Sequence, residues 1–218
     1  MKKRGVKPKG KVDITWSANF AYAIGLLASD GCLQNDSRHI DLTSKDREQL
    51  ENFLRALSIK VKITNKNSSL SKKYLRVQFG DVLFYKFLLN IGFTPAKSKT
   101  IGAIIIPPKY FFDFLRGSFD GDGTFYSYWD PRWRSSFMFY TVFASASKKH
   151  IDWVREEINK RAKLKGHLTK SVDGSIYQLK YAKAESLKLY AKLYYDQDVL
   201  CLSRKRLKIE KAIRINKA

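Results

Sequence analysis

Residues 23–31 read AIGLLASDG, and residues 115–123 read LRGSFDGDG. Both stretches have the apolar character of a helix with a glycine near its middle, Gly25 or Gly117, and both end in Asp-Gly. Each also has a small residue four positions after that glycine, namely Ser29 after Gly25 and Gly121 after Gly117. Residues four apart share a helix face, and a face of small residues lets two helix backbones approach closely. The two stretches therefore predict a pair of packed helices.

Packing these helices together would place Asp30 and Asp122 side by side at one end. Two adjacent carboxylates in a basic protein are typical of a site for divalent cations. The structural alternative is that each Asp only ends a helix in an Asp-Gly turn, which Gly31 and Gly123 would suit. That alternative explains the pattern poorly, because a carboxylate at a helix C-terminus opposes the helix dipole and two together repel each other. We therefore expect Asp30 and Asp122 to bind metal.

The repeated pattern resembles the motif of the LAGLIDADG homing endonucleases, from about residue 16 onward. The matching residues are Gly25, Asp30 and Gly31 in the first copy, and Gly117, Asp120, Asp122 and Gly123 in the second. The first copy departs at Ala28, where the family has an earlier Asp that is not the metal ligand. The resemblance implies a metal site formed by Asp30, Asp122, Ser29 and Gly121, which binds Mg²⁺ or Mn²⁺ between the scissile phosphates. It also implies that Ca²⁺ binds without supporting cleavage.

The charge of the chain points to a polyanionic partner. There are 42 Lys and Arg against 20 Asp and Glu among 218 residues, a net charge of +22. An excess of this size favours nucleic acid first and an anionic membrane surface second. No apolar run reaches the ~18 residues needed to span a bilayer.

Two further observations bear on the compartment. The basic start at residues 1–4 is not followed by the apolar region of a secretory signal. Cys32 and Cys201 form no paired motif, and with three His they do not make a convincing zinc site. We expect an intracellular protein, in the cytoplasm or nucleoid of a prokaryote or in an organelle matrix, without a membrane partner.

The chain reads as one duplication behind a basic arm. We expect the arm at residues 1–15, a first repeat at 16–104 and a second repeat at 105–218. After the first motif helix the patterns predict strands at 32–35, 39–43, 61–64 and 74–79, with helices at 47–57 and 82–90. After the second they predict strands at 124–128, 136–144, 167–170 and 176–181, with helices at 151–162 and 184–194.

This order predicts an α+β fold of two αββαββα repeats, with antiparallel saddle-shaped sheets about a pseudo-two-fold axis through the paired motif helices. Such sheets leave one face for a ligand, and a β-ribbon can enter the major groove of DNA. Ser44 and Ser147 are taken as equivalent positions. Their separation of 103, against 92 for Asp30 and Asp122, predicts 11 extra residues in the second hairpin, near residues 129–134.

Two lysines occupy equivalent places after the last predicted helix of each repeat, Lys97 and Lys205. The resemblance implies that a lysine there lies beside the metal site and helps to activate water or stabilise phosphate. The alternative is a solvated or phosphate-contacting lysine, and the neighbours Lys99 and Arg204 could substitute.

Ser44 and Ser147 stand where many family members have Gln or Asn that positions solvent near the metals. Because both are small hydroxyls here, the resemblance implies a catalytic role less directly. Helix N-capping explains them equally well.

Base contacts are expected at alternate positions of the hairpins, because Arg and Lys suit guanine and Gln suits adenine. Each candidate is also consistent with a phosphate contact or an exposed side chain. Lys45 and Lys148 are expected to contact backbone phosphate. The other candidates are Gln34, Asp36, Arg38, Asp41, Lys62, Lys66, Arg76 and Gln78 in the first repeat, and Tyr126, Tyr128, Arg132, Arg134, Lys170 and Lys180 in the second.

The leading hypothesis is a monomeric, Mg²⁺-dependent, site-specific double-strand DNA endonuclease, encoded in a mobile intron and acting on a long asymmetric target. The alternatives are an intron RNA maturase and a non-cleaving DNA-binding protein on the same fold. The presence of both Asp30 and Asp122 favours cleavage and is compatible with an additional RNA role.

Overall fold

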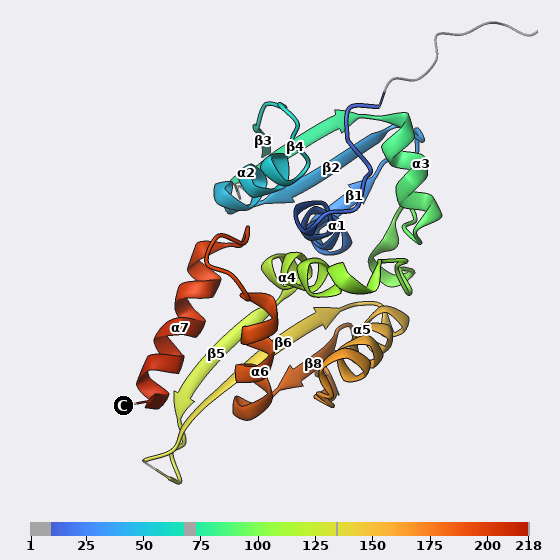
Figure 1. The fold of residues 1–218 in the computed structure, drawn as a ribbon. Coiled ribbons are helices and arrows are strands. Elements are labelled where there is room, and N and C mark those ends of the chain that lie inside the picture. Colours follow the sequence, from blue (N-terminus) through green and yellow to red (C-terminus); the bar gives the residue numbers. More distant parts are fainter. Residues whose placement is uncertain (1–9, 68–72, 134, 218) are drawn as a thin grey trace, which may run out of the picture.

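The computed structural model describes residues 10–67, 73–133 and 135–217. At its centre lie the two motif helices, α1 (Ala18–Asp30) and α4 (Phe111–Asp122), packed against each other (Figure 1). The small residues make this contact possible. A side-chain carbon at Gly25 would collide with the carbonyl oxygen of Phe114 and lie 2.7 Å from the nitrogen of Ser118. The expected close approach of the two backbones is confirmed.

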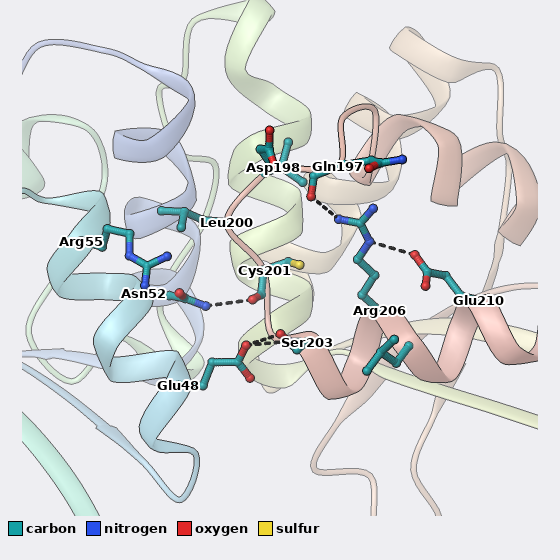
Figure 2. Close-up of a pocket in the computed structure, with 12 residues that line it drawn as sticks. Glu48, Asn52, Arg55, Gln197, Asp198, Leu200, Cys201, Ser203, Arg206 and Glu210 are labelled. Atoms are coloured by element: carbon teal, nitrogen blue, oxygen red, sulfur yellow. Dashed lines mark hydrogen bonds and ion pairs between the residues drawn. The ribbon is translucent and has the colours of Figure 1, made fainter.

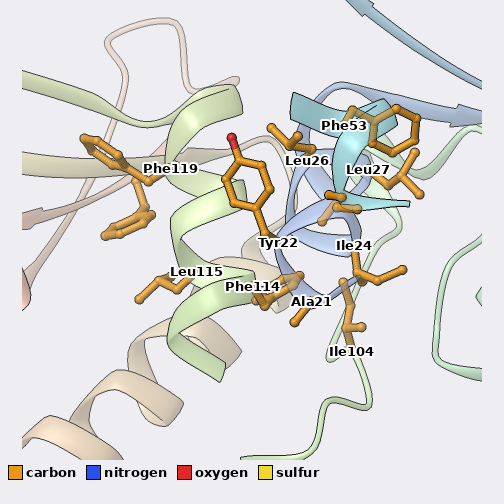
Figure 3. Close-up of a cluster of buried hydrophobic side chains, with 14 of the residues drawn as sticks. Ala21, Tyr22, Ile24, Leu26, Leu27, Phe53, Ile104, Phe114, Leu115 and Phe119 are labelled. Atoms are coloured by element: carbon orange, nitrogen blue, oxygen red, sulfur yellow. The ribbon is translucent and has the colours of Figure 1, made fainter. Parts of the chain in front are cut away.

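Large apolar side chains surround this helix pair and form the centre of the core. Figure 3 shows Tyr22 and Leu26 of α1 near Phe114 and Phe119 of α4, and all four are buried. Burial of apolar surface contributes roughly 25 cal/mol per Å², so this cluster is the main source of stability at the seam between the repeats. The seam in turn sets where the C-terminal ends of α1 and α4 lie.

Each motif helix is followed by a four-stranded antiparallel sheet (Figure 1). The first has the order β1-β2-β4-β3, and the second has the order β5-β6-β8-β7. Their strands are β1 (Gly31–Leu33), β2 (His39–Ser44), β3 (Thr64–Asn67) and β4 (Lys73–Gly80), then β5 (Thr124–Trp129), β6 (Phe137–Ser145), β7 (His167–Lys170) and β8 (Tyr177–Tyr181). The predicted α+β class with two repeated units is confirmed.

The remaining helices are α2 (Arg47–Ala56), α3 (Val82–Asn90), α5 (Lys148–Ala162), α6 (Lys183–Leu193) and α7 (Ser203–Lys217). Short 3-10 helices, η1 (Lys97–Lys99) and η2 (Pro108–Tyr110), precede α4. None of the helices in the described ranges is both long enough and apolar enough to cross a lipid bilayer.

Several sequence-based boundaries were wrong. The strand predicted at 61–64 is β3 at Thr64–Asn67, because Val61 and Ile63 pack on the core before strand pairing starts. The helix predicted from residue 151 starts at Lys148, because Ser147 caps it. Helix α7 was not predicted at all. Its sequence is mostly Lys, Arg and isolated apolar residues, so the apolar pattern of a helix is weak. The buried face is narrow and includes Ile209 and Ala212.

The proposed equivalence of Ser44 and Ser147 was also wrong. Strand pairing joins Cys32 to Asp41 and Thr124 to Val142, spans of 9 and 18 residues, so the second hairpin is 9 residues longer and not 11. Ser44 ends β2 as Ser145 ends β6, and each hydroxyl accepts a hydrogen bond from the N–H two residues later. The counterpart of Ser44 is therefore Ser145.

The start of α7 joins the second repeat to α2 of the first. Arg204 forms an ion pair with Asp46, Ser203 donates to Glu48, and the Asn52 side chain donates to the Cys201 carbonyl. Figure 2 shows the polar cavity beside this joint, of about 550 Å³. Neither Asp30 nor Asp122 lines it, so this cavity belongs to the contact between the repeats and not to the predicted metal site.

Candidate active site

The C-terminal ends of α1 and α4 bring Asp30 and Asp122 together. A side-chain carbon at Gly121, the residue before Asp122, would lie 3.0 Å from Oδ2 of Asp30. Strands β1 and β5 begin directly after the two carboxylates, and Gly31 and Gly123 have extended backbones with φ of −81° and −73°. These glycines do not form left-handed helix terminators. The structural alternative of a simple Asp-Gly turn therefore does not account for the paired acids.

The electrostatics of the pair favour a bound cation. The pKa of Asp30 is raised to about 6, first by burial and then by the charge of Asp122. Partial desolvation also raises the pKa of Asp122, and Lys97 and Lys205 oppose that rise. Two carboxylates that are both costly to ionise would be stabilised by a divalent ion between them, and carboxylate oxygens are the hard ligands that Mg²⁺ prefers. Within the described residues, no group of three or more Asp, Glu, His or Cys side chains is placed to hold a metal ion, so the candidate site is the carboxylate pair alone.

Asp30 is held by a glutamine that the sequence analysis missed. Gln49 of α2 donates a hydrogen bond of 2.6 Å to Oδ2 of Asp30, and Ser44 donates 2.8 Å to the amide oxygen of Gln49. Ser44 thus acts through Gln49, and it is not the N-cap of α2, which is Asp46. A signal was available in the sequence. Gln49 precedes Phe53 and Ala56 at helical spacing, which places a polar side chain on the buried face.

The described residues of the second repeat contain no equivalent of this amide contact. Ser147 does cap α5, accepting from the N–H of His150 and donating to the Ile101 carbonyl. His150, three residues after its cap as Gln49 is after Asp46, instead hydrogen-bonds the Gly102 carbonyl through Nδ1. In the part of the chain that the structure describes, no side chain donates a hydrogen bond to the Asp122 carboxylate. The two acids therefore differ in their support.

Both predicted lysines lie at the site, and they occupy equivalent positions. Nζ of Lys97 donates to the carbonyl of Ser29, and Nζ of Lys205 donates to that of Gly121, each at 3.0 Å. Both side chains are buried. Burial lowers the pKa of Lys97 and lowers that of Lys205 to about 8.

The two lysines differ in how fully they are bonded. Lys205 also donates to the carbonyls of Phe119, Asp120 and Gly123, at 2.6, 2.8 and 2.6 Å, so its three N–H groups are shared among four acceptors at the end of α4. Lys97 has one carbonyl partner and lines a cavity of about 360 Å³ together with Asp122 and the segment 144–146. Of the suggested substitutes, Lys99 is exposed and Arg204 forms an ion pair with Asp46.

A third motif carboxyl, Asp120, is buried in the seam between the helices. Its Oδ2 atom accepts from the Tyr22 hydroxyl at 2.8 Å and from the Leu202 N–H at 2.6 Å. Burial raises its pKa to about 6. Asp120 therefore links α1 and the segment before α7 to α4. It is buried in the seam and is not part of the solvent-facing site at Asp30 and Asp122.

Comparison with known proteins identifies the fold. Residues 17–92 match the family model of a LAGLIDADG-like domain. The fold matches homing endonuclease I-WcaI bound to its DNA recognition sequence, with 16% identity, a TM-score of 0.59, and coverage of 90% of this chain and 88% of that one. The chain has the LAGLIDADG fold. The resemblance inferred from the two motifs is thereby confirmed.

Two further structures with the LAGLIDADG fold also match the chain. Full-length DUF199/WhiA from Thermatoga maritima matches at 14% identity and a TM-score of 0.59, over 94% of this chain. This chain spans only 64% of that protein's length. I-DmoI in complex with DNA and Ca matches at 14% identity and a TM-score of 0.54, covering 83% of this chain and 91% of that one. No curated protein sequence matches the chain.

In the first LAGLIDADG repeat, strand register gathers many of the predicted DNA-binding residues on one sheet face. Cys32, Asp41 and Gln78 form one cross-strand row, and Thr43 and Arg76 belong to the next. Gln34 donates to Asp41 at 2.9 Å, Lys66 donates to Thr43 at 3.4 Å, and Lys45 lies over the ring of Tyr74. Asp36 instead organises the β1–β2 turn by accepting from the backbone of Arg38 and His39, while Lys62 is exposed before β3 begins.

In the second LAGLIDADG repeat, Tyr126 and Tyr128 share a face with Tyr140, and Lys180 lies in the cross-strand row of Val142 on that face. Lys170 has the opposite alternation and lies over the ring of Tyr177. Lys148 is on α5, paired with Asp152, and Arg132 is held by Asp130 in the hairpin loop. Arg134 and the first nine residues of the predicted arm lie outside the described residues. Tyr140 was not among the sequence-based candidates.

Proposed function

We propose that this chain is a metal-dependent, site-specific double-strand DNA endonuclease that acts as a monomer on a long asymmetric duplex. The observation that carries the proposal is the repeated unit at the seam: a motif carboxylate, with a buried lysine donating to the carbonyl of the residue before it. The unit occurs twice, once for each strand of a duplex. The similar I-WcaI and I-DmoI structures contain DNA, and the net charge of +22 suits that partner.

The residues present fit a divalent ion. Asp30 and Asp122 would hold it. The backbone carbonyls of Ser29 and Gly121 could add ligands, and they already accept hydrogen bonds from Lys97 and Lys205, while the Ser29 hydroxyl donates to carbonyls of its own helix. When bound, Mg²⁺ or Mn²⁺ would stabilise the attacking and leaving oxygens of phosphodiester hydrolysis. We expect Ca²⁺ to support binding without cleavage, and the I-DmoI complex with DNA and Ca is consistent with divalent metals at this fold.

In this proposal, different side chains of the protein have different roles. Lys97 would hold a proton or stabilise the phosphate beside the cavity at Asp122, Gln49 would orient Asp30, and the sheet faces would bind the duplex. The repeat boundaries at 16–104 and 105–218, an intron origin and an intracellular location remain part of the proposal.

A non-cleaving DNA-binding role is the second candidate, because the LAGLIDADG fold is shared by WhiA and so does not by itself assign cleavage. One observation favours it. The proposed metal site has two carboxylates, and no group of three or more Asp, Glu, His or Cys side chains in the described residues could hold a metal ion. An intron RNA maturase role would use the same basic surface, and it predicts tight binding to the structured intron RNA.

Substitution of the acids tests the proposal. Duplexes containing the intronless insertion locus are incubated with Mg²⁺ and wild-type protein, Asp30→Asn or Asp122→Asn. We expect wild type to cleave both strands and both variants to bind the same DNA without double-strand cleavage, because the amide is a poor Mg²⁺ ligand and no phosphate contact is removed. Undiminished cleavage by either variant would contradict the metal assignment. Specific binding by wild type without cleavage would select the second candidate.

A further inference from the structure

The outward face of the second sheet carries an aromatic cluster, which we define as Tyr126, Tyr128 and Tyr140. Strand register pairs Tyr126 with Tyr140 and Tyr128 with Met138. The alternate residues Phe125 and Phe139 are buried in the core. Since successive side chains of a strand point to opposite faces, the aromatic cluster and Met138 lie on the face turned away from the core.

The three rings of the aromatic cluster lie nearly parallel to one another. Tyr126 and Tyr140 have centroids 5.2 Å apart and an interplanar angle of 20°, and Tyr128 lies 6.4 Å from Tyr140 at 7°. Rings stacked in this way cover one another's faces. What they offer to a ligand is their edges, which suits contact with groups at the edge of a groove better than stacking on unpaired bases.

The chemistry around the aromatic cluster is largely apolar. Val142, opposite Thr124 on the same face, is buried, and Met138 is half-buried. Lys180 pairs with Val142 and Gln178 pairs with Ala144, so polar groups of this face come from β8. Close to the β5–β6 ribbon, this face therefore presents the three tyrosine rings with their hydroxyls and the half-buried Met138.

The outward face of the first sheet has the opposite character. Its cross-strand rows contain Asp41 with Gln78 and Thr43 with Arg76, all hydrogen-bonding side chains. The Nε atom of Arg76 is buried and finds no hydrogen-bond partner among the described residues. The two repeats have the same fold, but the outward face of the second sheet is aromatic and that of the first sheet is rich in hydrogen-bonding side chains.

We propose that the second sheet recognises a thymine-rich half of the DNA target through the 5-methyl groups of thymine, while the first sheet recognises its half through hydrogen bonds. The inference rests on the proposed function, because it assigns the base preference of the same DNA-binding surface. The thymine methyl is the apolar group that unmodified base pairs present in the major groove. The ring edges and Met138 offer apolar contact to that methyl, and the hydrogen-bonding groups of the aromatic cluster are its three hydroxyls.

The test begins with selection of bound duplexes from a randomised library at moderate salt, using the full chain with Ca²⁺. In the selected duplex, deoxyuridine then replaces thymine in one half at a time, which removes methyl groups and leaves base pairing unchanged. We expect each contacted methyl in the thymine-rich half to contribute about fourfold in affinity. Deoxyuridine in the other half should change affinity by less than twofold.

Variants assign the halves to the sheets. The double substitution Tyr126→Ser and Tyr140→Ser should abolish the difference between thymine and deoxyuridine. The matched change on the first sheet, Arg76→Met, should retain it and weaken preference in the other half. Tyr126→Phe keeps the ring and should behave as wild type towards deoxyuridine. If the double variant does not fold, the deoxyuridine duplexes with wild type and Arg76→Met still decide the question.

The outcomes distinguish a failure of the proposed DNA-binding function from a failure of the proposed thymine preference. Failure to enrich any duplex would overturn site-specific DNA binding, and the inference with it. Enrichment of a duplex in which deoxyuridine has equal effects in both halves would overturn the inference alone. Persistence of the thymine preference in a folded double variant would do the same. Tight binding of a single-stranded RNA pool in preference to duplex DNA would indicate that the rings stack on bases, against both proposals.

Discussion

Gln49 donates a hydrogen bond of 2.6 Å to Oδ2 of Asp30, and the second repeat has His150 at the corresponding helix position, turned to the Gly102 carbonyl. The two acids of one site therefore have different surroundings, although they come from equivalent motifs. The asymmetry begins in α2 and α5 and not in the motif helices. Because of this asymmetry, a variant in one repeat can be compared with the equivalent variant in the other repeat. The comparison measures how much the contact with Gln49 affects the site.

The Ser44–Gln49–Asp30 chain predicts unequal effects of two serine substitutions. Ser44→Ala removes the hydroxyl that holds the Gln49 amide, and the hydrogen bond from Gln49 is one of the effects that lower the pKa of Asp30. We expect the acid limb of the cleavage-rate profile to move to higher pH. Ser145→Ala removes the equivalent hydroxyl of β6 and should leave the limb in place. Equal shifts in both variants would show that the chain does not support Asp30.

The paired acids predict a stability that falls with rising pH when metal is absent. The pKa of Asp30 is about 6 in the folded chain against an ordinary 3.8, so the folded state binds more protons than the unfolded state between these values. Stability contributed by the protonated form is therefore present below about pH 4 and is lost as the pH rises through about 6. Asp30→Asn should remove this component and raise the free energy of unfolding at neutral pH by about 1–2 kcal/mol.

Thermal unfolding with and without Mg²⁺ checks that prediction. Wild type should gain stability when Mg²⁺ is added, because an ion that binds only the folded state shifts the equilibrium toward it. Asp30→Asn should gain little. A variant less stable than wild type in metal-free buffer would show that burial and the charge of Asp122 do not destabilise the Asp30 carboxylate.

The two lysines should separate activity from stability. Lys205 satisfies four carbonyls at the end of α4, so Lys205→Met should cost about 2–4 kcal/mol of unfolding free energy by leaving buried acceptors unpaired. Lys97 satisfies one carbonyl beside an open cavity, and Lys97→Met should cost about 1 kcal/mol while reducing cleavage strongly. Denaturant unfolding and single-turnover cleavage measure the two effects. The reverse ranking in stability would contradict the contact pattern.

The helix seam predicts that one methyl group can disrupt the fold. Gly25→Ala would drive a carbon into the backbone of α4 at Phe114 and Ser118, so we expect a loss of more than about 3 kcal/mol or failure to fold. Gly102→Ala is the matched control, since a carbon there meets nothing within 4 Å. Circular dichroism melting compares the two. A Gly25→Ala protein as stable as the control would mean that the helices do not approach so closely.

The basic surface predicts a single protein per duplex and steep salt dependence. Both repeats are in one chain, so light scattering of the complex should give one protein per DNA. The plot of log affinity against log salt should have a slope of roughly −0.9 per phosphate contact. Replacing a lysine that contacts phosphate, with Lys66→Met as the first choice, should reduce the slope by about one. Two proteins per duplex, or a slope near zero, would contradict the expected mode of binding.

The two motifs determined most of the architecture, because helix spacing and small residues are local properties that can be read along the chain. Gly25 and Gly117 predicted the seam, and the pairing of Asp30 with Asp122 followed from it. The resemblance to the LAGLIDADG family implied that Lys97 and Lys205 lie beside these acids. Alternation within β1, β2, β5 and β6 predicted which residues share a sheet face, since successive side chains in a strand face opposite ways. These predictions needed no knowledge of distant contacts.

Other features were decided only by the tertiary structure. The register of β6 on β5 showed that Ser145 corresponds to Ser44, because the length of a hairpin loop cannot be counted from sequence spacing alone. Gln49 reaches Asp30 because α2 crosses the end of α1, and His150 turns away because the Gly102 carbonyl accepts its ring nitrogen. Lys97 and Lys205 look alike in sequence. They differ because α7 carries Lys205 into the four carbonyls that end α4, a contact between residues more than eighty positions apart.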